Sequence, residues 1–444
     1  MDEVKCDRAS ALDRINRLPI TSYHRRLMWI LGFVFFFEYT DINTLSFASP
    51  AIMRFWHVPV NSIAELVSAT FMGMFVGSAA GGWVSDRFGR KRALLYTTLW
   101  YTGFSLLNAL AWNITSLFIF RLLTGVGISA MIVIGITYIS ELFPAPVRGT
   151  YQGWIMAIGL CGVPITAYVA RFCIPLASWG WRLVFVWGSL GLIFPFFVGV
   201  LEESPRWYED HDQFDQADAA LDRIESQIKL EVGRLPDPVE TQGVRPVTRT
   251  RFSEVFISPH LRRTVLLVIA WIFGSLGFFG FTSWVPTLLV ARGVSLVHSL
   301  SWSSAIATAC IPGAILAAAV SDKFDRKWSI LGVTVLIAIC GVFYGTTLHV
   351  ATILIFGVLV EMLIHTFTPL MYAYTAEGFA SSIRTSGTGI AYGAGRLANV
   401  FGPFIVAFIF GRYGYSYVFL YIALTWVAIG FIVGAFGPRS KQLA

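Results

Sequence analysis

The amino-acid sequence predicts an all-α membrane protein whose twelve transmembrane helices form two six-helix bundles. Composition is the first observation: 56% of the 444 residues are hydrophobic, only 13% are charged, and the mean hydropathy is +0.66. Soluble domains carry roughly 25% charged residues and cannot bury this much apolar surface. The other two observations are the spacing of long apolar runs and the placement of basic residues between them. An ordinary soluble domain, a disordered chain and a disulfide framework are therefore excluded.

The apolar runs are long enough to be helices that cross a bilayer. Crossing roughly 30 Å of hydrocarbon takes about 20 residues. We expect spans at 27–49, 63–85, 93–112, 116–139, 150–172, 181–201, 264–290, 299–321, 328–347, 350–374, 385–410 and 415–437. These runs are too long for barrel strands, so helices are the expected spanning element. The segment 1–26 is too polar and too charged for a cleaved signal peptide.

The basic residues give the expected orientation of the chain. If the spans alternate as drawn, all but seven of the 33 Lys and Arg residues fall outside the spans on one side of the membrane. The seven exceptions are Arg54, Arg121, Arg171, Arg182, Arg292, Arg396 and Arg412. The positive-inside rule then places both termini in the cytoplasm. The same rule accounts for the net charge of +7 without a nucleic-acid partner.

A long polar segment in the middle divides the chain into two halves. We expect a cytoplasmic N-terminal segment (1–26), a first bundle (27–201), a cytoplasmic central loop (202–263), a second bundle (264–437) and a cytoplasmic tail (438–444). The mixed-charge stretch from Glu209 to Arg223 predicts a short surface helix within the central loop.

Charged loops recur at matching places in the two halves. Residues 82–91 follow the second span, and a related charged stretch follows the eighth; a Glu and an Arg also follow both the fourth and the tenth span. Such repetition is typical of a parallel six-helix repeat. We interpret these residues as a cytoplasmic latch: Gly82, Asp86, Arg87, Gly89, Arg90, Glu141, Arg148, Glu203, Arg206, Asp322, Arg326, Glu377 and Arg384.

In this latch, Gly82 would let two helices approach closely and Gly89 would permit a tight turn. Asp86 would face the N-terminus of a neighbouring helix. The arginines would pair with Glu141 or Glu203 and hold the bundles together in one conformation. The alternative is a set of solvated charges that only anchor the topology.

These motifs resemble the major facilitator superfamily, and the resemblance covers essentially the whole chain. Residues 82–91 match its signature between spans 2 and 3, residues 121–125 its signature in span 4, and residues 203–207 the motif after span 6 in sugar-porter-like members. The second latch looks degenerate, because Asp325 stands where the family has glycine. Within the superfamily, the acids in residues 38–41 resemble those of aromatic-acid and metabolite proton symporters.

Charged side chains inside the spans are functional candidates, because each costs at least about 2.5–3.5 kcal/mol to insert. Asp41 lies about 14 residues into its span, and Arg121 about 6 residues in from the other side, which puts both at the same depth. Glu38 lies one turn from Asp41. We interpret Asp41, Glu38 and Arg121 as a proton-coupling site. The alternative is a static pair that neutralises a buried arginine.

A second group of candidates surrounds Arg396, whose planar guanidinium suits a substrate carboxylate. Glu361 would hold Arg396 until substrate displaces it, or would form a permanent bridge to it. His365 lies one turn from Glu361 and is either a second proton carrier or a satisfied core histidine. Tyr392 and Trp284, together with Tyr372, would line a cavity for a planar ring, although membrane packing explains any one aromatic residue equally well.

The sequence therefore predicts a secondary transporter that carries a small organic acid anion, such as an aromatic carboxylate, together with a proton by alternating access. No motif of an enzyme, a metal site or a nucleotide-binding loop is present, so we expect no cofactor beyond the coupling proton. The expected partners are a small-molecule substrate and the lipid bilayer, and the expected state is a monomer in a bacterial inner membrane. Two alternatives stay open: a proton-linked metabolite or drug exporter, and a sensor that kept this fold.

Overall fold

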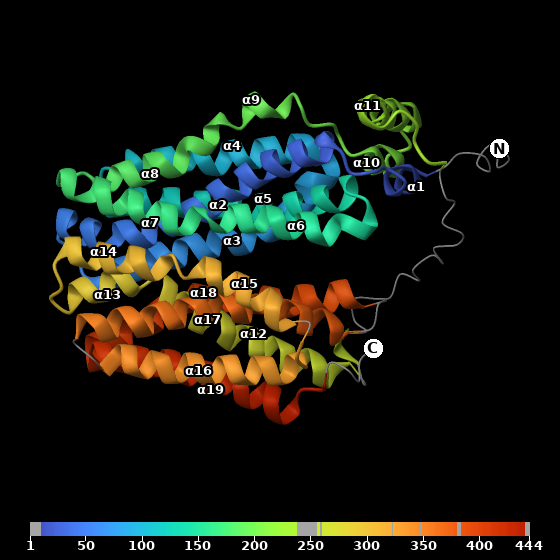
Figure 1. Cartoon of the computed structure of the whole chain (residues 1–444). Helices are drawn as coiled ribbons and strands as arrows, with labels where there is room; N and C mark the ends of the chain where they lie inside the picture. Colours follow the sequence, from blue (N-terminus) through green and yellow to red (C-terminus); the bar gives the residue numbers. More distant parts are fainter. Residues whose placement is uncertain are drawn as a thin grey trace.

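Two helical bundles lie side by side in the protein (Figure 1). The structure is a computed structural model that describes residues 10–237, 255–257, 260–321, 323–346, 349–379 and 383–439, without the side chain of residue 385. Over these residues the secondary structure is helical, with no strand. This confirms the predicted all-α class.

The first bundle contains the helices from α2 to α9. They are α2 (Ser22–Trp56), α3 (Val60–Phe88), α4 (Arg90–Ala109), α5 (Ile114–Leu142), α6 (Ala145–Leu160), α7 (Gly162–Cys173), α8 (Trp181–Ser189) and α9 (Pro195–Val198), with 3₁₀ turns at Ile174–Leu176 and Leu190–Ile193. The second bundle consists of α12 (Leu261–Thr282), α13 (Val285–Ala291), α14 (Leu296–Ala307), α15 (Cys310–Ser321), α16 (Arg326–Thr346), α17 (Val350–Glu377), α18 (Arg384–Tyr413) and α19 (Tyr415–Phe436).

Ten of the resulting helical segments in the described chain are long and apolar enough to cross a membrane by themselves. The two other spans are α2, which carries two carboxylates, and α4, which begins with Arg90, Lys91 and Arg92. Both nevertheless pack inside the first bundle, α2 against α6, α7 and α8, and α4 against α5 and α8. These two helices complete the twelve predicted spans.

Helices α3 and α5 pack with their backbones in contact. A Cβ atom added at Gly73 or Gly77 would strike the carbonyl oxygen of Leu122 or Val126, and one at Gly81 would come within 2.8 Å of the Cα atom of Ala130. Small residues every fourth position allow such an approach. The prediction for Gly82 is wrong in this structure, since nothing lies within 4 Å of its Cβ position. The close approach is made instead by Gly81, which is one residue earlier and on the same face of α3 as Gly73 and Gly77.

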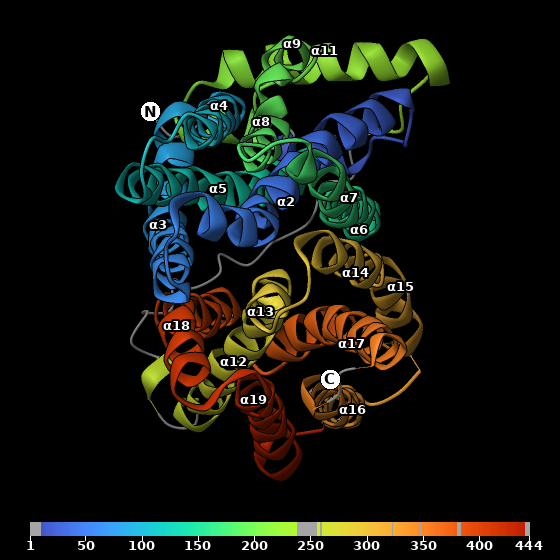
Figure 2. The same cartoon turned by 90° about the vertical axis from the view of Figure 1, so that its left-hand side faces the viewer.

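The two bundles meet mainly on the face opposite α1 (Ala11–Asn16), which Figure 2 views directly. There α3 lies along α18, and α7 lies along α14. Toward the face that carries α1, α15 contacts α6 only sparsely. Three hydroxyl groups make polar contacts across this seam. Ser46 Oγ donates to the carbonyl of Thr282 at 3.0 Å, Ser68 Oγ donates to the carbonyl of Val400 at 2.7 Å, and Arg171 Nε donates to Ser301 Oγ. The protein is therefore closed on this far face.

A small helical cap covers the first bundle on the face that carries α1. It consists of α1, α10 (Pro205–Asp210) and α11 (Phe214–Val232), shown at the right of Figure 1. The short helix predicted between Glu209 and Arg223 is thus two helices, the second running nine residues further. The break falls at Asp212, whose positive φ of 57° ends the first of them.

Ion pairs attach α1 to α11. Arg14 Nε donates to Glu225 Oε1 at 2.9 Å, and Arg17 Nη2 donates to the same oxygen at 2.6 Å. Arg14 also contacts Asp222 at 2.6 Å. Burial alone would raise the pKa of Glu225, but the hydrogen bonds and charges of the two arginines outweigh burial and hold the pKa below its usual value. The contact is therefore present at neutral pH and weakens as the pH falls through that lowered pKa.

We expect Glu225→Gln to detach α1 from the cap, because both arginines lose a charged acceptor worth about 1.5–3 kcal/mol. Amide hydrogen exchange in residues 11–16 of the purified protein should speed up by roughly 10- to 150-fold. Wild type should lose the same protection as the pH falls through the lowered pKa of Glu225. Asp222→Asn is the matched control, because that carboxylate is 71% exposed and its pair is screened by solvent. Equal effects of the two substitutions would contradict the assignment to Glu225.

Candidate functional site

Asp41 and Arg121 form an ion pair inside the first bundle. Arg121 Nη1 lies 3.4 Å from Asp41 Oδ2, and both side chains are fully buried. Two neighbouring helices complete the pair: Thr70 Oγ1 of α3 accepts from Arg121 Nε at 3.1 Å, and Ser105 of α4 donates its hydroxyl to Asp41. The predicted pairing of Asp41 with Arg121 is present, whereas its role in proton coupling stays a prediction.

Glu38 does not share Arg121 with Asp41, and this part of the prediction is wrong. Its buried carboxylate lies within electrostatic range of Arg396 of the second bundle instead, without a direct ion pair to it among the described residues. Positions three apart on a helix differ in direction by about 60°. Because α2 lies at the edge of its bundle, this difference in direction points Asp41 toward Arg121 in the same bundle and Glu38 toward Arg396 in the other bundle.

Arg396 lies where the two bundles meet and is bound from both sides. Its Nη1 donates to Ser129 Oγ of α5 at 3.0 Å, and its Nη2 donates to the hydroxyl of Tyr392 at 2.7 Å. The guanidinium carbon lies 4.9 Å from the centre of the Tyr392 ring. Its Nε is buried and has no hydrogen-bond partner among the described residues. The Nε donor of this guanidinium is therefore left for a further acceptor.

Tyr392, the ring beside Arg396, belongs to a cluster of three aromatic rings. Trp271 lies 4.8 Å from Tyr372 and 5.1 Å from Tyr392, and the two tyrosine rings are 5.5 Å apart. The Tyr372 side chain is 45% exposed despite these contacts, so it borders open space. Trp284 is not part of this group: it precedes α13 and is buried elsewhere, with 1% exposed. Sequence reasoning missed Trp271, because 15 tryptophans in an apolar chain give no single one a distinct signal.

Glu361 pairs with His365 rather than with Arg396. His365 Nδ1 lies 3.5 Å from Glu361 Oε1 and 3.0 Å from the carbonyl oxygen of Glu361. Both side chains are nearly buried in the second bundle, where the Phe278 ring lies 5.4 Å from the histidine ring. Over the described residues Glu361 forms no ion pair with Arg396, so neither the displaceable nor the permanent bridge expected between them is present.

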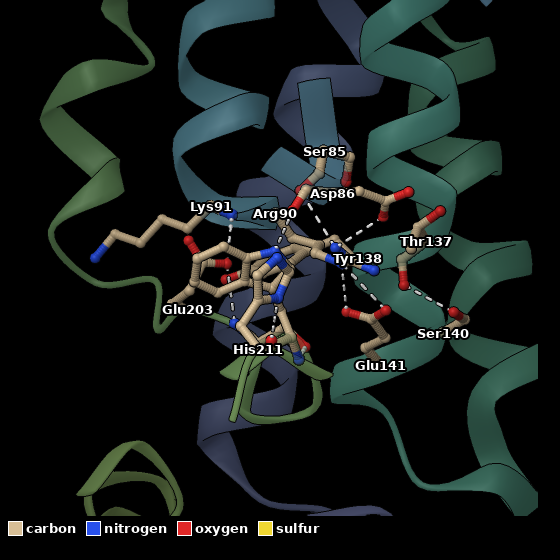
Figure 3. A network of polar contacts seen from close by, with 12 residues as sticks. Ser85, Asp86, Arg90, Lys91, Thr137, Tyr138, Ser140, Glu141, Glu203 and His211 are labelled. Carbon is tan, nitrogen blue, oxygen red and sulfur yellow. Dashed lines mark hydrogen bonds and ion pairs between the residues drawn. The ribbon is translucent and has the colours of Figure 1, made fainter. Parts of the chain in front are cut away.

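On the face that carries α1, the latch residues of the first bundle form a network (Figure 3). Arg90 Nε donates to both oxygens of Glu141, at 3.0 and 3.2 Å, and its Nη1 lies 3.1 Å from Asp86. Glu203 accepts from the backbone amide of Lys91 at 2.9 Å. Glu203, and not Asp86 as predicted, is therefore the anion at the N-terminus of a helix, here α4.

Gly89 permits this arrangement. Its φ is +89°, a conformation that L side chains rarely adopt, and a Cβ there would collide with the carboxylate of Glu203. From α10, Trp207 Nε1 donates to the carbonyl of Asp86 at 2.7 Å. The tight turn predicted at Gly89 is present, and the same glycine also leaves room for the carboxylate.

Other latch residues are arranged differently from the prediction. Arg87 is exposed and stacks on Trp83, at 5.5 Å from the ring centre, while Arg148 donates to the carbonyl of Phe143 at 3.3 Å. Neither pairs with Glu141 or Glu203. Arg206 is exposed as well.

In the second bundle, Arg326 forms an ion pair with Glu377. Arg384 is exposed, and Asp322 lies outside the described residues. Each of these charged contacts joins residues of one bundle. Among the described latch residues, no ion pair joins the two bundles in this conformation, which is closed on the opposite face.

Comparison with known proteins identifies the family. The sequence profile of the Major Facilitator Superfamily matches residues 31–360 and 298–443. The chain belongs to this superfamily. A candidate metabolite transport protein of Bacillus subtilis (strain 168), YyaJ, is 43% identical over 435 residues, 98% of this chain and 96% of the relative. The niacin transporter NiaP of Acinetobacter baylyi is 28% identical over 97% of both chains.

Among solved structures, a partially occluded inward-open conformation of the xylose transporter XylE from E. coli matches with a TM-score of 0.74. The match covers 95% of this chain and 99% of the other at 18% identity, and it shows a shared fold.

The family profile and the relatives together identify the protein as a multi-pass membrane protein and a metabolite transporter of the superfamily, not an enzyme. Within the described residues, no group of three His, Cys, Asp or Glu side chains is placed to hold a metal ion.

We expect Gly89→Ala to destabilise the network around Glu203. A side chain at positive φ costs about 1–2 kcal/mol, and the Cβ also displaces the carboxylate. The apparent Tm of the purified protein should fall by several degrees. Gly82→Ala in the same motif is the matched control: it meets nothing within 4 Å and should be neutral or slightly stabilising. A loss of the same size in both variants would contradict this explanation.

Proposed function

We propose that the protein is a proton-coupled symporter of a small organic acid anion, with aromatic carboxylates as the substrate class. The observation that carries the proposal is the unpartnered, buried Nε of Arg396 beside three aromatic rings at the junction of the bundles. A positive hydrogen-bond donor next to aromatic rings fits a planar substrate that carries a negative charge at one end.

The guanidinium of Arg396 supports recognition of a carboxylate. A carboxylate binds bidentately to two N–H groups on one edge of the fork, and Nε is still available on such an edge. Trp271, Tyr372 and Tyr392 would then contact an attached ring edge-to-face or by offset stacking. NiaP is named for niacin, which is a planar aromatic carboxylic acid.

Glu38 supplies a simple form of coupling, because it competes with the substrate for Arg396. When Glu38 is ionised, its charge offsets that of Arg396. When Glu38 is protonated, the positive charge of Arg396 is available to a substrate anion. A proton and an anion then enter the site together, which is symport. In this proposal Asp41 holds Arg121 in one state, and its protonation releases that arginine and favours the other state.

The face that carries α1 would be cytoplasmic, as the positive-inside rule predicts. In that orientation the seam at Ser46, Ser68 and Arg171 closes the outer side, and the conformation described is inward-facing. The proposed setting is a bacterial inner membrane, with both termini in the cytoplasm and a single chain as the working unit. Alternating access then consists of opening this seam while the inner side closes.

The substrate assignment predicts the behaviour of Arg396→Ala. In proteoliposomes with an inward proton gradient, wild type should accumulate labelled nicotinate and not xylose. Arg396→Ala should lower uptake by at least 100-fold, because a charged hydrogen-bonding partner worth about 3 kcal/mol is lost. Arg412→Ala on the same helix is the matched control, because its side chain is exposed near the far face. Uptake of xylose, or normal nicotinate uptake by Arg396→Ala, would refute this assignment.

The coupling assignment predicts a different defect in Asp41→Asn. This variant should retain nicotinate exchange between preloaded vesicles and medium, because exchange needs no net proton movement, but should lose accumulation driven by the gradient. In Glu38→Gln, the apparent affinity for nicotinate should no longer fall as the pH rises from 5 to 8. Gradient-driven accumulation that survives in both variants would exclude these carboxylates as the proton carriers.

A further inference from the structure

A hollow of about 210 Å³ opens at the end of the second bundle, on the face that carries α1 and far from Arg396. It lies where α12 begins and where α17 and α19 end. Arg262, Arg263 and Tyr374 line it, with Leu266 and Leu267 as an apolar floor. None of these residues takes part in the transport site or the latch described above.

The charge at the mouth of this hollow is positive. Arg262 and Arg263 are exposed, and Arg262 has no acceptor among the described residues. Arg263 Nη1 lies 3.5 Å from the carbonyl of Gly378, a contact at the upper limit of hydrogen-bond length. Asp325 forms no ion pair with either arginine among the described residues, and its Oδ1 accepts from the amide of Lys327 at 3.0 Å. Two guanidinium groups therefore remain available to an anion.

The hollow continues into an apolar stripe on the outside of the bundle. Its wall includes Phe436, which is 54% exposed. The Phe436 ring lies 5.9 Å from that of Phe431. From Phe431 the exposed side chains of α19 follow one face of the helix at spacings of three and four residues: Leu420, Leu424, Val427 and Phe431. In a transmembrane helix such a face contacts lipid chains. The positive hollow thus lies at the depth of the lipid headgroups, above a surface that fits acyl chains.

We propose that this hollow binds the phosphate group of an anionic phospholipid. Arg262 and Arg263 hold the phosphate oxygens, and the acyl chains run along α19. Arginine is suited to phosphate because its planar fork presents paired donors, and basic pockets at the ends of transmembrane helices are attractive to anionic headgroups. The bound lipid would join the ends of α12, α17 and α19 on this face of the second bundle.

The chain carries a matched control for this site. Arg25 and Arg26 are adjacent exposed arginines at the start of α2, the first helix of the other bundle, as Arg262 and Arg263 are at the start of α12. Replacing either pair with alanine removes the same charge from the same face. If the arginines served only as topology anchors, or only attracted the protein to anionic membranes in general, both replacements would have the same effect.

The experiment measures lipid binding to the full-length protein in a zwitterionic detergent by native mass spectrometry, with dioleoylphosphatidylglycerol and dioleoylphosphatidylcholine as probes. Wild type should bind one phosphatidylglycerol more tightly than the rest, and phosphatidylcholine should not replace it. The double variant Arg262→Ala/Arg263→Ala should bind that lipid about 30-fold more weakly, at about 1 kcal/mol per arginine. Arg25→Ala/Arg26→Ala should stay within a few-fold of wild type.

Three results would overturn the proposal. Equal losses in the two double variants would mean general electrostatic attraction. Equal binding of phosphatidylcholine would mean that the acyl chains alone are recognised. Displacement of the lipid by millimolar inorganic phosphate, at matched ionic strength, would mean that the hollow takes the free anion. Circular dichroism of each variant verifies folding, and Arg262→Lys/Arg263→Lys should recover part of the affinity because it restores the charge.

Discussion

The arrangement of this protein depends on how two arginines are accommodated in a region that is otherwise poor in charge. An unpaired guanidinium in the membrane interior is costly, so each one needs acceptors from neighbouring helices. Arg121 obtains them from α2 and α3, all inside one bundle. Arg396 obtains its acceptors from α18 itself and from α5 of the opposite bundle. The first arginine therefore strengthens one bundle, while the second makes the contact between bundles depend on charge.

This difference gives the two buried acids different roles. Asp41 is held by Arg121 and Ser105, which both belong to its own bundle. Glu38 interacts with a residue that a bundle movement would carry away. A substrate that satisfies Arg396 would therefore change the balance at the interface directly, without a separate element to transmit the signal. The proposed coupling of proton and anion follows from this competition.

Much of the fold could be predicted from the sequence, because apolar length and charge placement are local properties. The pairing of Asp41 with Arg121 was also predictable, since equal depth leaves a buried arginine few alternatives. The partners of Glu38 and Glu361 were not predictable in this way. Depth along a helix says nothing about the direction in which a side chain points, and a rotation of about 60° selects a different neighbour. The same limit explains why the sequence points to Gly82 although Gly81 makes the close approach, and why it does not distinguish Trp271 from other aromatic residues.

The contact of α3 with α5 has a mechanical consequence. Backbone meets backbone at Gly73, Gly77 and Gly81, so neither helix can slide or turn against the other without a collision. From Ser68 at the far seam to Asp86 in the terminal network, α3 spans about 27 Å at 1.5 Å per residue. A rigid rod of this length transmits displacement: a tilt that separates Ser68 from Val400 must move Asp86 in the opposite direction. The inner and outer ends of the first bundle can therefore exchange open and closed positions as one motion.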